Sequence, residues 1–349
     1  MKPSVLLLFL WMLTLAVSAQ QLPPIGNWRE HVPFNNAFQV DNQKELIICG
    51  TSYGFFTYNP VDKEFHRKTK INGLSDVGLK ILSKDPNSNM LILVYENSNI
   101  DLINGDIIQN LPDVLLKKTQ SDKNINSAIW IGNEVYLSTN LGIVVVNTEK
   151  KEIKDTYRTG LNGIDEKIYQ LALQQNFLYA ATSAGLKKAP FSPASLTDAN
   201  NWILEKGQAL TTGKCDAVLD WNGKLFAKKQ DSIFIKNDGI WELLFSSNIS
   251  ISNINISNNK LFIGQTNNNK GQVIAFSSTS TNHQTITQAW LTMPMNCNQI
   301  GDILWVADKN NGLVRISGSS AESIKPNSPD GIATGKAIYA DGNIWATAG

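Results

Sequence analysis

The chain repeats one pattern seven times, and this repeat restricts its fold more than any other feature. Each copy consists of a short apolar segment, a turn rich in polar residues or glycine, and a second apolar segment. The copies begin at Leu46, Leu91, Val135, Leu178, Leu225, Leu261 and Leu304. Their spacing is roughly the 40–50 residues of one four-stranded β-propeller blade.

Two further strands are expected in each repeat. An alternating segment precedes the central pair, as at 78–83 and 168–173, and a more polar one follows it, as at 64–68 and 152–157. Alternation with a period of two, bounded by Asn, Asp, Gly and Ser, is typical of β-strands. One blade cannot bury both faces of its sheet, so neighbouring blades must stack. The sequence therefore predicts an all-β fold, a β-propeller of about seven four-stranded blades at 20–334.

The two ends of the chain lead to separate predictions. Lys2, the apolar run 5–17 and the small residues before Gln20 are typical of a signal peptide at 1–19, which predicts export. Residues 27–32 are expected to form an outer strand that closes the ring. Residues 335–349 are expected to be the first strands of a second propeller in a truncated chain; alternatively, they help to close the ring.

Charge and cysteine content exclude several classes of protein. Removal of 1–19 takes away one of the 31 basic residues and none of the 30 acidic residues, so the mature chain is neutral. A neutral chain argues against nucleic acid as a partner. Cys49, Cys215 and Cys297 form neither a disulfide framework nor a CxxC metal pair. We expect free buried thiols, with a Cys215–Cys297 bridge as the alternative.

One motif has the form of a catalytic nucleophile. Residues 50–54 match the G-x-S-x-G elbow of hydrolases, which requires a strand that turns sharply into a helix. No helix is expected here, and the related segments 139–142 and 182–185 occupy the same place in other repeats. We therefore interpret the motif as a hairpin turn.

Other polar clusters also lack the spacing of a functional site. The oxygen-rich segments 85–89, 308–312 and 341–343 lack the EF-hand pattern and are interpreted as turns, with calcium in the central channel as an open alternative. The histidines are far apart in the sequence: His31, His66 and His283. We therefore predict no catalytic residue, no metal ligand and no cofactor, although propeller enzymes assemble their sites from separate blades.

The nine tryptophans are potential platforms for sugars. Most lie within strands at equivalent positions of the repeats, where packing between blades explains them. Trp202 and Trp290 lie in less regular segments, so these two are the candidates for an exposed ligand-binding residue. No other ligand-binding residue is assigned.

The linkers between repeats resemble a known propeller family. Residues 72–76, 159–163 and 330–332, the last followed by 341–349, resemble the D-G-L…D-x-x-G-x-x-W-x-x-T-x-x-G repeat of two-component-regulator propellers, common in Bacteroidota. The segment 25–35, IGNWREHVPFN, followed by NGLSDVG at 72–78, closely resembles the start of the PorZ family of type IX secretion system surface components. Three further segments share this resemblance: 99–103, 142–146 and 151–157.

The resemblance implies a non-catalytic protein at the outer cell surface. Members of the PorZ family work beside the sortase of the type IX secretion system and are thought to bind anionic lipopolysaccharide. They continue into a second propeller and a β-sandwich domain, and the resemblance supplies no motif for the lipopolysaccharide site. One alternative is the periplasmic sensor propeller of a hybrid two-component system, and another is a carbohydrate-active propeller enzyme.

Overall fold

The computed structural model describes residues 31–207, 209–329, 331, 334–340 and 343–348. The predicted signal peptide at 1–19 and residues 27–30 of the predicted closing strand therefore lie outside the described residues. Within the described ranges, no helix is long and apolar enough to span a membrane.

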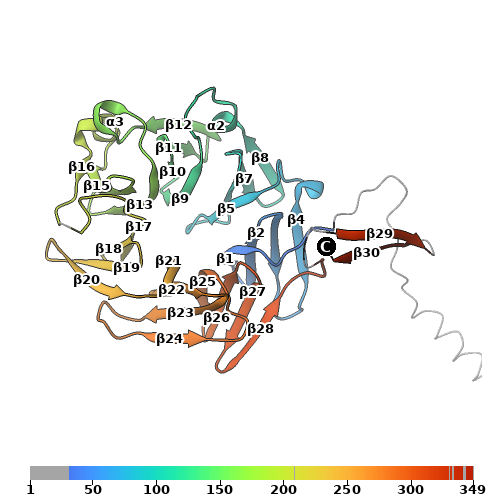
Figure 1. Ribbon diagram of the computed structural model, residues 1–349. Coiled ribbons are helices and arrows are strands. Elements are labelled where there is room, and N and C mark those ends of the chain that lie inside the picture. The colour runs from blue at the N-terminus through green and yellow to red at the C-terminus, as the bar shows by residue number, and fades with distance from the viewer. Residues whose placement is uncertain (1–30, 208, 330, 332–333, 341–342, 349) are drawn as a thin grey trace, which may run out of the picture. The chain divides into compact units, whose positions relative to one another are not determined.

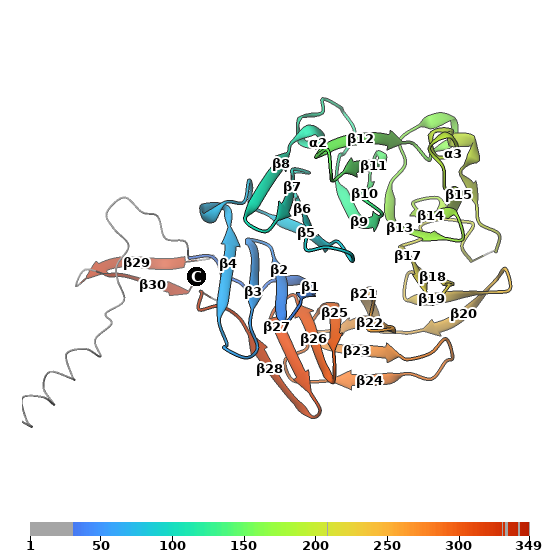
Figure 2. The same cartoon turned by 180° about the vertical axis from the view of Figure 1, so that it is seen from behind.

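Seven antiparallel sheets of four strands form a ring, which confirms the predicted all-β propeller (Figures 1 and 2). In every blade the first strand faces the centre of the ring, and the following strands pair outward in sequence order. Blades 1 and 2 comprise β1 (Ala37–Gln43), β2 (Leu46–Thr51), β3 (Gly54–Tyr58), β4 (Phe65–Thr69), β5 (Leu79–Lys84), β6 (Leu91–Tyr95), β7 (Ile100–Asn104) and β8 (Ile107–Leu111). Blades 3 and 4 comprise β9 (Ile125–Ile131), β10 (Glu134–Thr139), β11 (Gly142–Asn147), β12 (Glu152–Tyr157), β13 (Ile168–Gln174), β14 (Phe177–Thr182), β15 (Gly185–Pro190) and β16 (Ile203–Leu204).

The remaining blades follow the same plan. Blades 5, 6 and 7 comprise β17 (Ala217–Trp221), β18 (Lys224–Lys229), β19 (Ser232–Asn237), β20 (Ile240–Ser246), β21 (Ser250–Ser257), β22 (Lys260–Asn267), β23 (Lys270–Phe276), β24 (Gln284–Thr287), β25 (Pro294–Ile300), β26 (Ile303–Asp308), β27 (Gly312–Ser317) and β28 (Ser320–Ile324). The short helices and 3₁₀ turns between strands are η1 (Lys70–Asn72), α2 (Asp113–Leu116), η2 (Leu161–Gly163), α3 (Pro193–Thr197) and η3 (Ala199–Asn201). β29 (Thr334–Ala340) and β30 (Asn343–Ala348) pair with each other in a separate two-stranded sheet. That they begin a second propeller stays a prediction.

The middle strands are mostly apolar because both faces of each blade are buried. In β11, Val144 and Val146 pack against blade 2, while Ile143 and Val145 pack against blade 4. Since successive side chains of a strand point to opposite faces, a strand between two neighbours needs apolar residues at every position. Full burial of each such side chain contributes about 1.5–3 kcal/mol.

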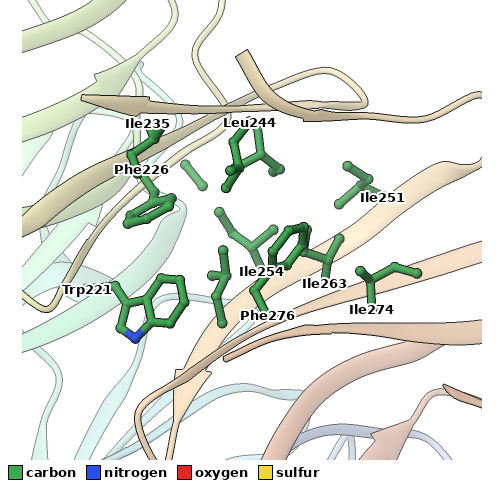
Figure 3. Close-up of a cluster of buried hydrophobic side chains, with 12 residues drawn as sticks. Trp221, Phe226, Ile235, Leu244, Ile251, Ile254, Ile263, Ile274 and Phe276 are labelled. Atoms are coloured by element: carbon green, nitrogen blue, oxygen red, sulfur yellow. The ribbon is translucent and has the colours of Figure 1, made fainter. Parts of the chain in front are cut away.

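Seven clusters of buried apolar side chains hold the ring together, one at each junction between consecutive blades. Figure 3 shows the junction of blades 5 and 6, where Trp221 and Phe226 of blade 5 share a cluster with Phe276 of blade 6. The blades therefore contact one another through sheet faces, as the repeat predicts.

Blades 7 and 1 close the ring by the same kind of face packing. Trp305 of β26 contacts Tyr58 of β3, with ring centroids 6.1 Å apart. Across the junction, the Val40 N–H donates to Asn296 Oδ1 at 3.2 Å, and Asn298 Nδ2 donates to Asn42 Oδ1 at 3.1 Å. The described strands of these two blades show no strand exchange, and the described residues 31–32 of the predicted closing segment lie in no strand.

Candidate functional site

The two candidate tryptophans lie in different environments. Trp202 is only 5% exposed, packs in the cluster between blades 3 and 4, and donates its indole N–H to the Leu196 carbonyl at 3.2 Å. The prediction that Trp202 is exposed is therefore wrong, because α3 and η3 fold its irregular segment back onto blade 4. Trp290 is 44% exposed, as expected. A ligand-binding role for Trp290 stays a prediction.

The segment 50–54 forms the turn between β2 and β3, which confirms its interpretation as a hairpin. Thr51 Oγ1 donates to the Gly54 carbonyl at 3.0 Å. Thr139 and Thr182 make the same bond to Gly142 and Gly185, both at 2.9 Å. The motif is thus a repeated structural turn.

The oxygen-rich segments 85–89 and 308–312 are also turns, as interpreted. Asp85 accepts from the Asn87 N–H at 3.0 Å and from Ser88 Oγ at 2.5 Å. Asp308 is fully buried and accepts from four backbone N–H groups and the Thr292 hydroxyl. Both carboxylates are therefore occupied by their own turns, whereas segment 341–343 lies largely outside the described residues.

The histidines and cysteines do not converge. His66 lies on β4, and His283 packs beside Phe276 with centroids 5.1 Å apart. All three cysteines are buried and free, so the alternative of a Cys215–Cys297 bridge is wrong. The described residues contain no cluster of three or more His, Cys, Asp or Glu side chains arranged to hold a metal ion.

The cavity that unites all seven blades is the central channel, with a volume of about 650 Å³. Its lining comes mainly from the innermost strand of every blade. Six of these strands carry an extra residue, a β-bulge, near the start of their pairing with the second strand. The bulged residues all line the channel: Phe38, Lys80, Asn126, Tyr169, Ser252 and Met295.

Blade 5 completes this ring of residues without a bulge. Asp216, directly before β17, also lines the channel, and its N–H donates to the Lys228 carbonyl at 2.8 Å. Bulges re-aim side chains and are frequent beside functional sites. We call these seven residues, the six bulged ones and Asp216, the bulge ring.

Basic groups gather around two residues of the bulge ring, Lys80 and Tyr169. Lys167 Nζ lies 5.2 Å from the centroid of the Tyr169 ring, and Lys214 Nζ lies 4.5 Å from it. Lys80 is close enough to Lys167 for their charges to interact. We call Lys80, Lys167, Tyr169 and Lys214 the lysine mouth.

The charges of this arc are only partly neutralised. Asp216 pairs with Lys214 at 2.5 Å and with Lys228 at 3.7 Å. Burial opposes ionisation of Asp216, but hydrogen bonds from Lys214 and the Gln230 N–H outweigh it and hold the pKa of Asp216 below its usual range. The channel lining contains three lysines, Lys80, Lys214 and Lys228, and one carboxylate, so its formal net charge is positive.

Lys80 shows the effect of unpaired charge most directly. Burial, and then the positive charge of Lys167, lower the pKa of Lys80, although Asp122 and Glu96 act in the opposite direction. Within the described part of the chain, neither Lys80 nor Lys167 forms an ion pair at contact distance. An incoming anion would relieve this repulsion.

Amide side chains in the channel fall into two groups. Some bridge neighbouring blades: Asn126 Nδ2 donates to the Ile168 carbonyl at 2.6 Å, and Asn255 bonds to the backbone of Cys297 at 2.7 and 3.1 Å. Others line the channel without such a role, since no hydrogen bond within the described chain involves the side chains of Gln39, Gln170 or Asn253. These amides are available to a ligand.

The sequence interpretation missed this site. A partial signal was present, since Lys80 lies within the expected strand 78–83 and Lys167 lies directly before the expected strand 168–173. Their convergence depends on the bulges and on ring closure, which a single sequence does not display. The only exposed candidate named from sequence, Trp290, does not line the channel.

Comparison with known proteins gives one family match. Residues 47–203 match the sequence model of the type IX secretion system protein PorZ, N-terminal β-propeller domain. No curated protein sequence matches the chain significantly.

Solved structures resemble the chain in fold. PorZ, a surface component of the type IX secretion system of Porphyromonas gingivalis, superposes with a TM-score of 0.77 at 18% identity, over 92% of this chain and 42% of its own. The extracellular domain of a putative one-component system from B. thetaiotaomicron gives 0.58 at 15% identity, over 83% and 40%. A putative hybrid two-component system from the same organism gives 0.55 at 15% identity, over 80% and 40%.

The chain thus spans less than half the length of these structures. The sequence match lies within the propeller, from β2 in blade 1 to β16 in blade 4. The resemblance predicted from the sequence is confirmed: residues 47–203 match the model of the PorZ N-terminal β-propeller domain, and the propeller shares its fold with PorZ.

Proposed function

We propose that this protein is a non-catalytic surface component of the type IX secretion system that assists the sortase by binding anionic lipopolysaccharide. The match of residues 47–203 to the PorZ N-terminal β-propeller carries this proposal. The fold alone would not, since β-propellers host many unrelated functions.

The channel supports binding without catalysis. Its described lining offers ammonium groups, amides and an aromatic ring, which are suited to an anionic, hydroxyl-rich ligand. No histidine lines the described channel to act as a base beside Ser83, Ser127 or Ser252. The arrangement favours binding of such a ligand.

The proposed location is the outer cell surface, reached after export through the inner membrane; the alternative location is the periplasm. Residues 1–19 support export because they have the charge, apolar length and small residues of a signal peptide. Labelling of intact cells with a membrane-impermeant amine reagent tests the location. Surface exposure predicts labelling in intact cells, and labelling only after lysis would contradict it.

Lipopolysaccharide binding is tested by surface plasmon resonance. Immobilised protein is expected to bind purified anionic lipopolysaccharide, to bind lipopolysaccharide without the anionic polysaccharide much more weakly, and to lose affinity as salt rises. Equal binding of both forms, or of neither, would contradict the proposal.

A sensor propeller is the second candidate. The fold likeness to extracellular domains of putative one- and two-component systems favours it. The two functions separate in a deletion strain. A sensor predicts altered transcription with normal cargo attachment, whereas a secretion component predicts defective attachment.

A further inference from the structure

Positive charge exceeds negative charge in one arc of the central channel lining together with Lys167, which lies beside the lining residues Lys80 and Tyr169. Lys214 shares Asp216 with Lys228, while Lys80 and Lys167 have no carboxylate at contact distance within the described chain. Asp122 acts electrostatically on both Lys80 and Lys167, and Glu96 acts on Lys80, in each case beyond contact distance. The arc therefore keeps two lysines without a direct counter-charge.

Blade geometry brings these lysines together from three blades. Lys80 is the bulged residue of β5 in blade 2, Lys167 precedes β13 of blade 4, and Lys214 precedes β17 of blade 5. Tyr169, the bulged residue of β13, lies beneath two of the three ammonium groups. The ring of Tyr169 stabilises nearby cations through its negative face and so helps to keep them in place.

The channel beside this arc suits a sugar more than a flat apolar ligand. Gln39, Gln170 and Asn253 come from three different blades and leave both amide atoms available. An amide side chain can donate one hydrogen bond and accept another at the same time, as two neighbouring hydroxyls of a sugar require. The cavity volume of about 650 Å³ is sufficient for a ligand of a few sugar units.

We propose that the lysine mouth binds the acidic group of an anionic saccharide, a phosphate or a carboxylate, while the free channel amides hold the adjoining sugar hydroxyls. Lys80 and Lys167 supply the main charge-assisted hydrogen bonds, and Lys214 adds a third. This assignment deepens the proposed function by giving its anionic ligand a place. It rests on that function only for the biological source of the ligand.

The test uses glucose 1-phosphate as probe and isothermal titration calorimetry on the full chain. The double variant Lys80→Gln/Lys167→Gln removes two charges that form no ion pair with any described residue, so folding is expected to survive. It should weaken binding at least roughly tenfold. The matched control Lys118→Gln/Lys150→Gln removes two exposed charges away from the channel and should bind like the wild type.

A second variant separates the effect of the positive charge on binding from the effect of side-chain shape. Lys80→Arg/Lys167→Arg keeps both positive charges and should recover most of the affinity that the glutamine variant loses. Glucose tests the need for the acidic group, and inorganic phosphate tests the need for the sugar. Both are expected to bind more weakly than glucose 1-phosphate.

Several results would overturn the inference. No binding of glucose 1-phosphate by the wild type, or equal binding by wild type and the glutamine variant, would remove the lysine mouth as an anion site. Inorganic phosphate binding as tightly as the sugar phosphate would overturn the saccharide assignment. If the glutamine variant binds lipopolysaccharide as tightly as the wild type, the lysine mouth is not the site, and the proposed function still stands. If the wild type binds the sugar phosphate at the lysine mouth but does not bind lipopolysaccharide, the site stands and the proposed function is refuted.

Discussion

At the scale of single residues, buried carboxylates organise the loops that lead from one blade to the next. Asp101 is fully buried and accepts from Tyr95 Oη at 2.6 Å and from the Ser75 N–H at 2.9 Å. Asp308 plays the same part before blade 7, where it holds the backbone of Thr292 and Met293. Each carboxylate thus serves as the hydrogen-bond acceptor that the N–H groups of an irregular linker do not find in the backbone.

Asp308→Ala should therefore be strongly destabilising. The change leaves four backbone N–H groups, in part-buried hydrogen bonds, without their acceptor, and each such group costs about 1–3 kcal/mol where water cannot replace the bond. We expect a loss of roughly 3 kcal/mol or more in the free energy of unfolding, measured by urea denaturation. Asp302→Ala, in the exposed turn between β25 and β26, is the control and should stay within about 0.5 kcal/mol of the wild type.

The thiols give a second test at this scale. Burial raises the pKa of Cys215 to about 12 and raises the pKa of Cys49 and Cys297 further, so all three remain protonated and unreactive at pH 8. A thiol-specific reagent at pH 8 should label none of them in the native protein and all three in denaturant without reductant. Labelling of one thiol in denaturant would indicate a disulfide, and fast native labelling would contradict their burial.

At the scale of the element, the hairpin between the middle strands is the most predictable part of the chain. Its apolar runs and its T-x-x-G turn are local in sequence, so the hairpins beginning at Leu46, Val135 and Leu178 could be placed from the sequence alone. The bulges could not, because a bulge is a property of register between two strands. The strands that carry the site could therefore be predicted from the sequence, whereas the site itself could not.

Similar motifs also take different structures in different linkers. Leu74 of the NGLSD segment is 3% exposed and packs between blades 1 and 2, whereas Leu161 of the TGLNG segment is 72% exposed on η2. Burial of such a residue depends on which neighbouring blade covers it. For the same reason the irregular segment around Trp202 suggested exposure wrongly.

The hairpin turn predicts a sharp response to one substitution. Gly142 has φ of +121°, and a Cβ there would lie 2.2 Å from the Tyr157 carbonyl oxygen. Gly142→Ala should therefore cost about 3 kcal/mol in thermal or urea unfolding, from strain and backbone displacement.

Gly132 is the matched control for this substitution. It also has a positive φ, +59°, but a Cβ would meet nothing within 4 Å. Gly132→Ala should cost only about 1 kcal/mol. Equal losses for the two variants would show that the contact with Tyr157 is unimportant.

At the scale of the whole molecule, the ring is stabilised by seven similar junctions between neighbouring blades. Because the last junction joins blades 7 and 1, residues far apart in sequence must meet before the ring is complete. The described propeller closes through Trp305, Tyr58 and the cluster around them rather than by a shared strand.

Trp305→Ala should weaken the whole propeller in one cooperative step. Removal of a buried tryptophan costs about 3–5 kcal/mol, and Trp221→Ala at the junction of blades 5 and 6 should cost a similar amount. Urea unfolding followed by circular dichroism is expected to show one transition for both variants. A separate early transition in the Trp305 variant alone would indicate that the ring opens without unfolding.

The most direct test of the proposed role is a clean deletion of the gene in its host, followed by measurement of secreted cargo attached to the cell surface. A component that serves the sortase with anionic lipopolysaccharide predicts that cargo is made but stays unattached, and that the wild-type gene restores attachment. Restoration by the Lys118→Gln/Lys150→Gln control, but not by Lys80→Gln/Lys167→Gln, would connect the defect to the channel. Normal attachment of cargo in the deletion strain would contradict the account.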